Sequence, residues 1–407
     1  MANMVDYLGW RGDLSFTAAP WNEIDALLIA SLSYLNFHGG RDPRGWTLEE
    51  LARIDSVQPS ASSSFPSRKA AFDLMASGER FRESRMHHAI ALTDEELEMQ
   101  FSALCLDLPD GTTCVAFRGT DNTIVGWRED FNMAYTSRVP AQEAAVLYLT
   151  RASELSRRPL RLMGHSKGGN LAVCAAAFAP AKIQNRIEGI WSFDGPGMNR
   201  ENAQSEGYLR IKDRIRSFVP QTSIIGQLMD YFDPYTVVHS SASGILQHDP
   251  MTWQVYGPRF ETQEALDRTA VVVRDTLHDW LQNSTPEQRA AFVDALFTLI
   301  DTTNATRMSD LTSEKLKSLL TMVGNRKEVD PETRRVFTRL MAQAVSIGFG
   351  NVIDWVRGRR EGESQWTWET MTPEQRREML TARMENSGDG QDEKGDPKEQ
   401  NGAEKDP

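Results

Sequence analysis

The run Gly164-His-Ser-Lys-Gly168 contains the residue types in this chain best suited to chemistry. It fits the pattern Gly-x-Ser-x-Gly, in which a serine lies on a sharp turn between a strand and a helix and exposes its hydroxyl above the sheet. Residues 160–163 before it are strand-like and apolar, and residues 170–179 after it form a helical pattern rich in small residues. The sequence therefore predicts Ser166 as a nucleophile.

An acyl-transferring serine needs a general base and a carboxylate that orients this base. In α/β-hydrolases the chain order is serine, acid, histidine. The histidines after Ser166 are His239, His248 and His278. We predict His248 as the base because it lies where a strand-like run turns into a proline-bounded loop, and such loops carry function. His239, after an apolar run, is the alternative, and His278 within a helical pattern is expected on the surface.

Asp194 is the expected acid because it directly follows the strand-like residues 187–193 and precedes turn residues that would expose it. Its alternative interpretation is a turn aspartate that bonds to its own backbone. The more usual acid position follows the next strand, and residues 218–224 contain no carboxylate there. Asp249, next to the predicted base, is expected to point elsewhere. The remaining alternatives for the acid are Asp230 and Asp233.

Backbone amides must stabilise the oxyanion that forms during acyl transfer. One donor is expected at Lys167, directly after the nucleophile. The second is expected at Thr120, which ends an apolar run and offers both an amide and a hydroxyl. The Lys167 side chain either assists an anionic substrate or reaches solvent. Residues 122–135 are rich in aromatic side chains and form either a lid over an apolar substrate or a loop packed on the core.

Strand-like and helical patterns alternate through the first part of the chain. Pro109-Asp-Gly111 separates two apolar runs as a hairpin turn would, and the sheet is expected to begin near residue 90. Helices are expected over 21–35, 68–83 and 141–156. The alternation predicts an α/β-hydrolase fold, with a mostly parallel sheet covered by helices.

Three regions are expected: a hydrolase domain with an N-terminal helical segment (1–260), a C-terminal all-helical extension (261–385) and a disordered acidic tail (386–407). Basic residues at both ends of 334–360 suggest a weak peripheral contact with an anionic membrane, although packing against neighbouring helices explains them more simply. The helices expected in the extension are 263–282, 286–302, 313–322, 331–356 and 373–385.

The composition is that of a globular protein, and a mechanism through an acyl-enzyme on serine is expected to need no cofactor. A net charge of −12 over 407 residues argues against a nucleic-acid partner. Cys105, Cys114 and Cys174 have no metal-ligand spacing and are expected to be buried thiols of a reducing compartment. His87-His88 is too isolated for a metal site. Without a recognisable signal peptide or membrane span, the expected location is cytoplasmic.

Several runs together resemble a known group of proteins. Phe117-Arg-Gly-Thr120 followed by Trp127 and the serine elbow resembles the class 3 (fungal-type) lipases. More closely, residues 7–256 resemble an uncharacterised bacterial lipase-like family, a domain of unknown function. The runs that carry this second resemblance are Gln-Phe-Ser-Ala, Phe-Arg-Gly-Thr-Asp, Gly-Trp-Arg-Glu-Asp-Phe, His-Ser-Lys-Gly-Gly-Asn, Phe-Asp-Gly-Pro-Gly and Gln-His-Asp-Pro. The resemblance implies a lipase-like fold and chemistry, and it leaves the helical extension unexplained.

The expected function is a serine hydrolase that cleaves a small-molecule carboxylic ester or a lipid through Ser166, His248 and Asp194. A peptidase or thioesterase with the same triad is an alternative. A second hypothesis is a hydrolase-fold module without activity that binds a partner through its helical region. The distances between the three side chains discriminate between these hypotheses.

Overall fold

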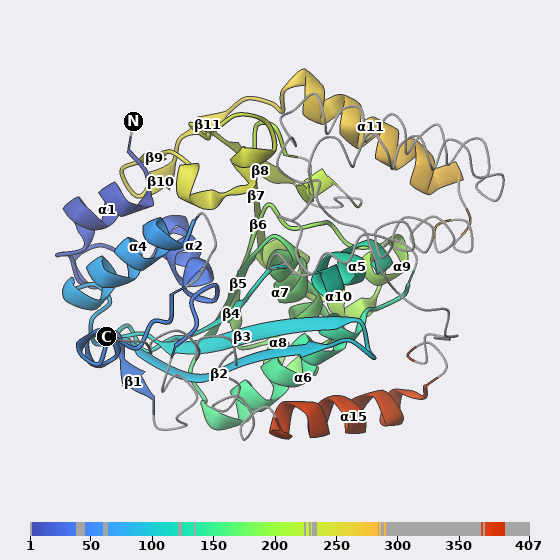
Figure 1. The fold of residues 1–407 in the computed structure, drawn as a ribbon, viewed down its shortest axis with the longest axis horizontal. Helices are drawn as coiled ribbons and strands as arrows, with labels where there is room; N and C mark the ends of the chain where they lie inside the picture. Colours follow the sequence, from blue (N-terminus) through green and yellow to red (C-terminus); the bar gives the residue numbers. More distant parts are fainter. Residues whose placement is uncertain are drawn as a thin grey trace, which may run out of the picture.

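The computed structural model describes residues 2–37, 45–59, 64–120, 124–133, 136–223, 225–227, 229, 234–283, 285, 289, 368 and 371–386. Figure 1 shows a twisted sheet with helices against both of its faces. Apart from residues 289 and 386, the helices expected over 286–302, 313–322 and 331–356, the segment expected to contact a membrane and the acidic tail lie outside these residues.

Within the described residues, nine strands form one sheet in the order β1-β2-β3-β4-β5-β6-β7-β8-β11. Strands β4 to β8 are parallel, and the strands on either side of them are antiparallel. The strands of this sheet are β1 (Trp46–Thr47), β2 (Arg85–Asp94), β3 (Met99–Asp107), β4 (Thr113–Phe117), β5 (Leu160–His165), β6 (Ile187–Phe193), β7 (Ile215–Pro220), β8 (Tyr235–Val238) and β11 (Thr262–Gln263). Two further strands, β9 (Val255–Tyr256) and β10 (Arg259–Phe260), pair with each other.

The helices cover the sheet in two layers. The α-helices are α1 (Met4–Arg11), α2 (Glu23–Leu32), α3 (Leu48–Arg53), α4 (Phe65–Ser77), α5 (Ile124–Asn132), α6 (Pro140–Leu155), α7 (Lys167–Phe178), α8 (Ala181–Gln184), α9 (Arg200–Ala203), α10 (Glu206–Ile211), α11 (Arg268–Asn283) and α15 (Pro373–Asn386). The 3₁₀ turns are η1 (Lys212–Arg214), η2 (Ile225–Gln227), η3 (Gly244–His248) and η4 (Pro250–Thr252). Helices α1 to α4 lie on one face, and α6, α7 and α10 lie on the other.

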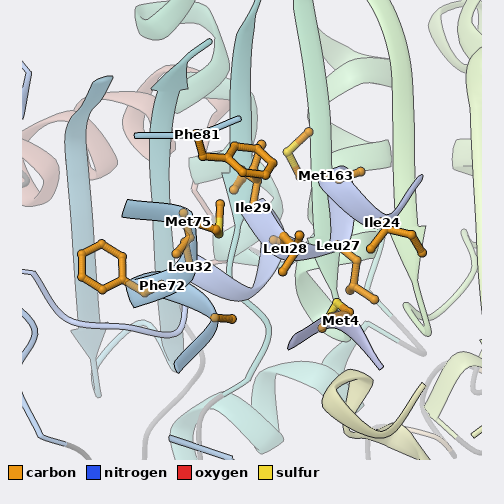
Figure 2. Packing of buried hydrophobic residues seen from close by; sticks show 14 of the residues in the cluster. Met4, Ile24, Leu27, Leu28, Ile29, Leu32, Phe72, Met75, Phe81 and Met163 are labelled. Atoms are coloured by element: carbon orange, nitrogen blue, oxygen red, sulfur yellow. The ribbon is translucent and has the colours of Figure 1, made fainter. Parts of the chain in front are cut away.

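Alternation along the central strands produces two hydrophobic cores. In β4, Cys114 and Ala116 face the N-terminal helices, whereas Val115 and Phe117 face α6 and α7. This period of two is the one expected of a strand whose two faces are both buried. Figure 2 shows the first core, where side chains of α1, α2 and α4 meet Met163 of β5. All three cysteines are buried free thiols.

Strand β2 begins at Arg85, five residues before the expected start of the sheet, and therefore includes His87 and His88. The sequence signal was weak because His88 has a φ of 54° and the register shifts between His87 and Ile90. Such a bulge interrupts the alternation by which a strand is recognised.

The chain after residue 260 continues the sheet before it becomes helical. The expected helix at 263–282 begins only at Arg268, because Thr262 and Gln263 form β11 and pair with β8. The helix expected at 373–385 is present as α15. It packs against α6 and β2, with Leu380 buried and Arg383 bonded to Asp94 at 2.8 Å. This helix therefore adds to the core of the sheet domain on the side of α6 (Figure 1).

Candidate active site

Ser166 lies at the turn between β5 and α7 with φ 60° and ψ −136°. A non-glycine residue rarely adopts this backbone, and such conformations persist where the surrounding structure holds them. The Ser166 amide donates to the carbonyl of Phe193 at 2.9 Å, which fixes the turn to β6. The strand, the sharp turn and the helix predicted from the motif are all present.

The two glycines of the motif are required by close contact. A Cβ atom on Gly164 would lie 2.1 Å from the carbonyl oxygen of Gly168. A Cβ atom on Gly168 would lie 2.1 Å from the carbonyl oxygen of Phe117, at the end of β4. Larger residues would push α7 away from the sheet and displace the serine, so both positions require glycine.

Asp194 and His248 are brought together from elements 54 residues apart. His248 Nδ1 lies 2.6 Å from Asp194 Oδ2, and the Asp194 side chain is 1% exposed. Asp194 follows β6, the neighbour of the strand that ends at Ser166, and His248 ends η3. Nδ1 donates to the carboxylate, so the pair fixes the tautomer whose Nε2 accepts a proton.

The loop after β7 contains no acid but contributes a hydroxyl to the site. Ser223 Oγ donates to Asp194 Oδ1 at 2.5 Å, so the two carboxylate oxygens have different partners. A Cβ atom on Gly226 would lie 2.4 Å from Asp194 Oδ1, so this loop packs directly on the carboxylate. Ser223 is a residue of the site that the sequence patterns did not indicate, because residues 218–224 contain no carboxylate.

His165, directly before the nucleophile, connects three parts of the site. Its Nε2 donates to the carbonyl of His248 at 2.7 Å, and its Nδ1 lies 2.9 Å from the hydroxyl of Tyr34. The Tyr34 hydroxyl also accepts from the amide of Gly119 at 3.1 Å. Burial, together with the nearby His248 and Arg68, holds the pKa of His165 well below its ordinary value. A neutral His165 with its proton on Nε2 can make all of these contacts, which join the loop that contains His248 to the serine turn.

The expected oxyanion residues lie on either side of the nucleophile. Lys167 is the first residue of α7, and first-turn amides of a helix have no partner within that helix. A Cβ atom on Gly119 would lie 2.7 Å from Ser166 Cβ, so the loop that carries Thr120 passes directly beside the serine. The Thr120 hydroxyl donates to Asp130 Oδ2 at 2.5 Å. The hydroxyl of Thr120 is therefore engaged by a buried carboxylate on α5.

The Lys167 side chain does not reach solvent or a substrate, contrary to both sequence interpretations. Its residue is 1% exposed, and Nζ lies 2.9 Å from Glu129 Oε2. It also donates to the carbonyl of Gln100 at 3.0 Å. The first turn of α7 points this side chain toward α5 and β3. The Lys167 ammonium group is therefore a charge buried inside the protein.

The alternative site residues lie elsewhere or outside the described residues. His239 Nδ1 lies 3.1 Å from Glu261 Oε1, and His278 is exposed on α11. Asp249 accepts from the Ser64 hydroxyl at 2.6 Å, and its other oxygen lies 3.9 Å from Arg68. Asp249 therefore fixes the loop that contains His248 (the histidine loop) to the start of α4. Asp230 and Asp233 belong to the residues that are not described.

Asp130 gives the site a measurable pH dependence. Burial raises its pKa from 3.8 to about 6, although Lys167, Thr120 and His248 lower it and Glu129 raises it further. Between these two values the folded protein holds a proton that the unfolded chain has lost, so stability falls as the pH rises. We expect wild type to lose about 2 kcal/mol of unfolding free energy from pH 4 to pH 7 through this group.

The measurement is urea unfolding of wild type and Asp130→Asn at pH 5 and pH 7.5. The variant should be the more stable protein at pH 7.5, and this advantage should shrink at pH 5, where the wild-type carboxyl is protonated. Asp213→Asn, an exposed change of the same kind, controls for net charge. If Asp130→Asn were more stable than wild type by the same amount at both pH values, the raised pKa of Asp130 would be contradicted.

The described residues contain no group of three or more His, Cys, Asp or Glu side chains arranged to bind a metal ion. In the same part of the chain, no helix has both the length and the apolar character needed to cross a bilayer.

The strand order, the two helical layers and the serine elbow define an α/β-hydrolase fold of the lipase-like type. A family model described as Mbeg1-like matches residues 75–298, more than half of the chain. The chain belongs to the Mbeg1-like family, and the resemblance to a lipase-like family is confirmed. A comparison with curated proteins finds no match.

Solved structures with a similar arrangement include several lipases. M37 lipase is 14% identical, with a TM-score of 0.32, and the match covers 50% of this chain and 68% of that one. A lipase from Rhizopus microsporus var. chinensis is 15% identical, with a TM-score of 0.32 and coverages of 52% and 75%. The Rhizomucor miehei lipase in its propeptide complex is 16% identical, with a TM-score of 0.31 and coverages of 48% and 65%. Likeness at this level does not define an activity.

Proposed function

We propose that this protein is a serine hydrolase that cleaves carboxylic esters. The observation that carries the proposal is the 2.6 Å contact between His248 and Asp194. The backbone at this pair bonds to the serine turn: the Ser166 amide donates to the carbonyl of Phe193, and His165 Nε2 donates to the carbonyl of His248. A histidine oriented by a buried carboxylate, next to a serine on such a turn, is the arrangement that activates a hydroxyl for attack on an acyl group.

In the proposed mechanism, Ser166 Oγ attacks the acyl carbonyl carbon while His248 Nε2 takes its proton. The amides of Thr120 and Lys167 stabilise the oxyanion of the tetrahedral intermediate. His248 then protonates the leaving alcohol, and the acyl group stays on Ser166 as an ester. Water, deprotonated by His248, releases the acid and restores the serine. Asp194 keeps Nδ1 protonated and stabilises the imidazolium throughout.

We propose that the acyl group of the substrate is apolar. Leu246, two residues before His248 in the chain, is 68% exposed and would offer an apolar contact to a substrate bound there. We therefore propose an acyl lipid or another apolar ester rather than a charged substrate.

Covalent labelling tests the proposal. A fluorophosphonate probe should label the purified wild type, and mass spectrometry of the peptides should locate the adduct on Ser166. Labelling should disappear in Ser166→Ala and remain in Ser77→Ala, which changes an exposed serine at the end of α4. A folded wild type without any adduct would refute the activated serine and favour a binding module that lacks activity.

A further inference from the structure

A buried ion pair connects the nucleophile turn to the helix beside it. Lys167 Nζ lies 2.9 Å from Glu129 Oε2, and both side chains are fully buried. Separating such a pair would leave two uncompensated charges in a region of low polarity. Lys167 directly follows Ser166, so the pair acts on the residue whose amide is a proposed oxyanion donor.

Glu129 has further partners that hold α5 in place. Its Oε2 accepts from the amide of Gln100 in β3 at 3.0 Å, and its Oε1 accepts from the amide of Ala141 in α6 at 2.8 Å. Asn132, on the same helix, donates to Glu98 at 3.1 Å. One carboxylate therefore joins α5 to β3, to α6 and to the elbow.

The position of α5 determines the position of the oxyanion loop. Asp130, next to Glu129, accepts from the Thr120 hydroxyl at 2.5 Å. A Cβ atom on Gly126 would lie 2.8 Å from Thr120 Cγ2 and 2.5 Å from Gln100 Oε1, so α5 packs on this loop without spare room. A displacement of α5 would move Thr120 with it.

We propose that Lys167 is a positioning residue whose ion pair with Glu129 holds α5 permanently in the arrangement that completes the oxyanion site. This proposal rests on the serine hydrolase function proposed above. A lid that opens at a lipid surface must leave its contacts, and α5 would have to break a buried ion pair to do so. The substrate class that follows is the dissolved, monomeric acyl ester, hydrolysed without activation by a lipid–water interface.

The first test is the hydrolysis rate of tributyrin across its solubility limit. For wild type we expect the rate to approach saturation below the solubility limit. It should change less than about twofold when emulsion droplets appear, because the site does not need contact with a lipid surface to become complete. A rise of about tenfold or more at the limit would overturn the proposal, since it would show that the site is completed only at a lipid surface.

The second test removes both charges of this ion pair in the variant Lys167→Met/Glu129→Met. We expect kcat on dissolved tributyrin to fall about 10- to 100-fold with KM nearly unchanged, because a displaced oxyanion donor acts in the transition state. The rate on droplets should fall less, so that the ratio of the two rates rises above the wild-type ratio. An equal loss on both forms of substrate would indicate a merely structural pair and overturn the proposal.

Lys69→Met is the matched control because Lys69 pairs with Asp73 at 2.8 Å on the surface of α4. Its rates should stay within about twofold of wild type, as expected for an exposed pair. If the double variant does not fold, the dependence of the wild-type rate on tributyrin concentration still tests whether the enzyme needs activation by an interface. Fluorophosphonate labelling separates the two proposals. A labelled wild type whose rate rises at the interface would refute only the role of the Lys167–Glu129 pair, whereas an unlabelled and inactive wild type would refute the hydrolase function as well.

Discussion

Asp194→Asn should lower kcat on a dissolved ester by about 10⁴-fold, as expected when the carboxylate that orients a catalytic histidine is replaced by an amide. The carboxylate accepts from His248 Nδ1 at 2.6 Å. An asparagine can present its NH₂ group there, which favours the tautomer with the proton on Nε2. That tautomer cannot accept the serine proton. KM should change little because the replaced group does not contact the substrate.

The comparison variant is Asp249→Asn, which changes the other carboxylate of the histidine loop. Asp249 accepts from Ser64 at 2.6 Å and fixes the loop to α4, and His248 Nδ1 bonds Asp194 instead. We expect its kcat to fall less than about tenfold, through a slightly displaced loop. Steady-state kinetics of both variants and of wild type shows which of the two carboxylates orients His248. Losses of the same size in the two variants would exclude Asp194 as the orienting acid.

The positions of Ser166, Asp194 and His248 were predictable because local patterns place each of them at the end of a strand or in a loop after one. The C-terminal ends of parallel strands meet at one edge of a sheet, so residues far apart in the chain converge there. The contact of His248 with Asp194 spans 54 residues and agrees with the predicted pairing of these two side chains.

The contacts that surround these residues were not predictable because they depend on side-chain direction across long separations. Tyr34 meets His165 across 131 residues, and no local pattern at either position indicates the partner. Ser223 was missed because a hydroxyl is too common in loops to stand out.

Lys167 was misinterpreted although the sequence contained a signal. Residues 168–177 of α7 include no charged residue, and the structure buries every one of them. A helix that is apolar all round is buried all round, so a lysine in its first turn has little access to solvent. Its partner, Glu129, lies 38 residues earlier in the chain, and no pattern links the two.

A second buried ion pair, in the N-terminal helical layer, should have a large effect on stability. Arg80 donates to both oxygens of Asp25, with Nε at 2.8 Å from Oδ1 and the second contact to Oδ2 at 2.6 Å. Neither side chain is exposed. The Tyr7 hydroxyl donates to the same carboxylate at 3.0 Å, and burial with the nearby Asp25 raises the pKa of Tyr7 to about 12. Further guanidinium contacts reach the carbonyls of Leu14, Ala19 and Pro20.

Arg80→Met should lower the free energy of unfolding by about 3–5 kcal/mol, since it leaves Asp25 as an uncompensated buried charge. Urea unfolding at pH 7.5, followed by circular dichroism, measures the loss. Arg53→Met is the control because Arg53 and Glu49 form an exposed pair on α3, which should contribute less than about 1 kcal/mol. An Arg80→Met loss no larger than that of the control would contradict the prediction.

The same variant has a pH dependence whose sign follows from the burial of Asp25. In the wild type burial already raises the pKa of the Asp25 carboxyl, while Arg80 lowers it. Without Arg80 this pKa rises further in the folded state, so the folded variant binds the proton more tightly still than the unfolded chain. The stability of Arg80→Met should therefore decrease, relative to wild type, as the pH rises from 5 to 7.5. In Arg80→Met/Asp25→Leu the charge is absent, so the stability difference from wild type should be smaller at pH 7.5 and should lose this pH dependence. If the double variant were as unstable as Arg80→Met at both pH values, the loss would come from the guanidinium contacts with the carbonyls of residues 14–20 rather than from the unpaired carboxylate.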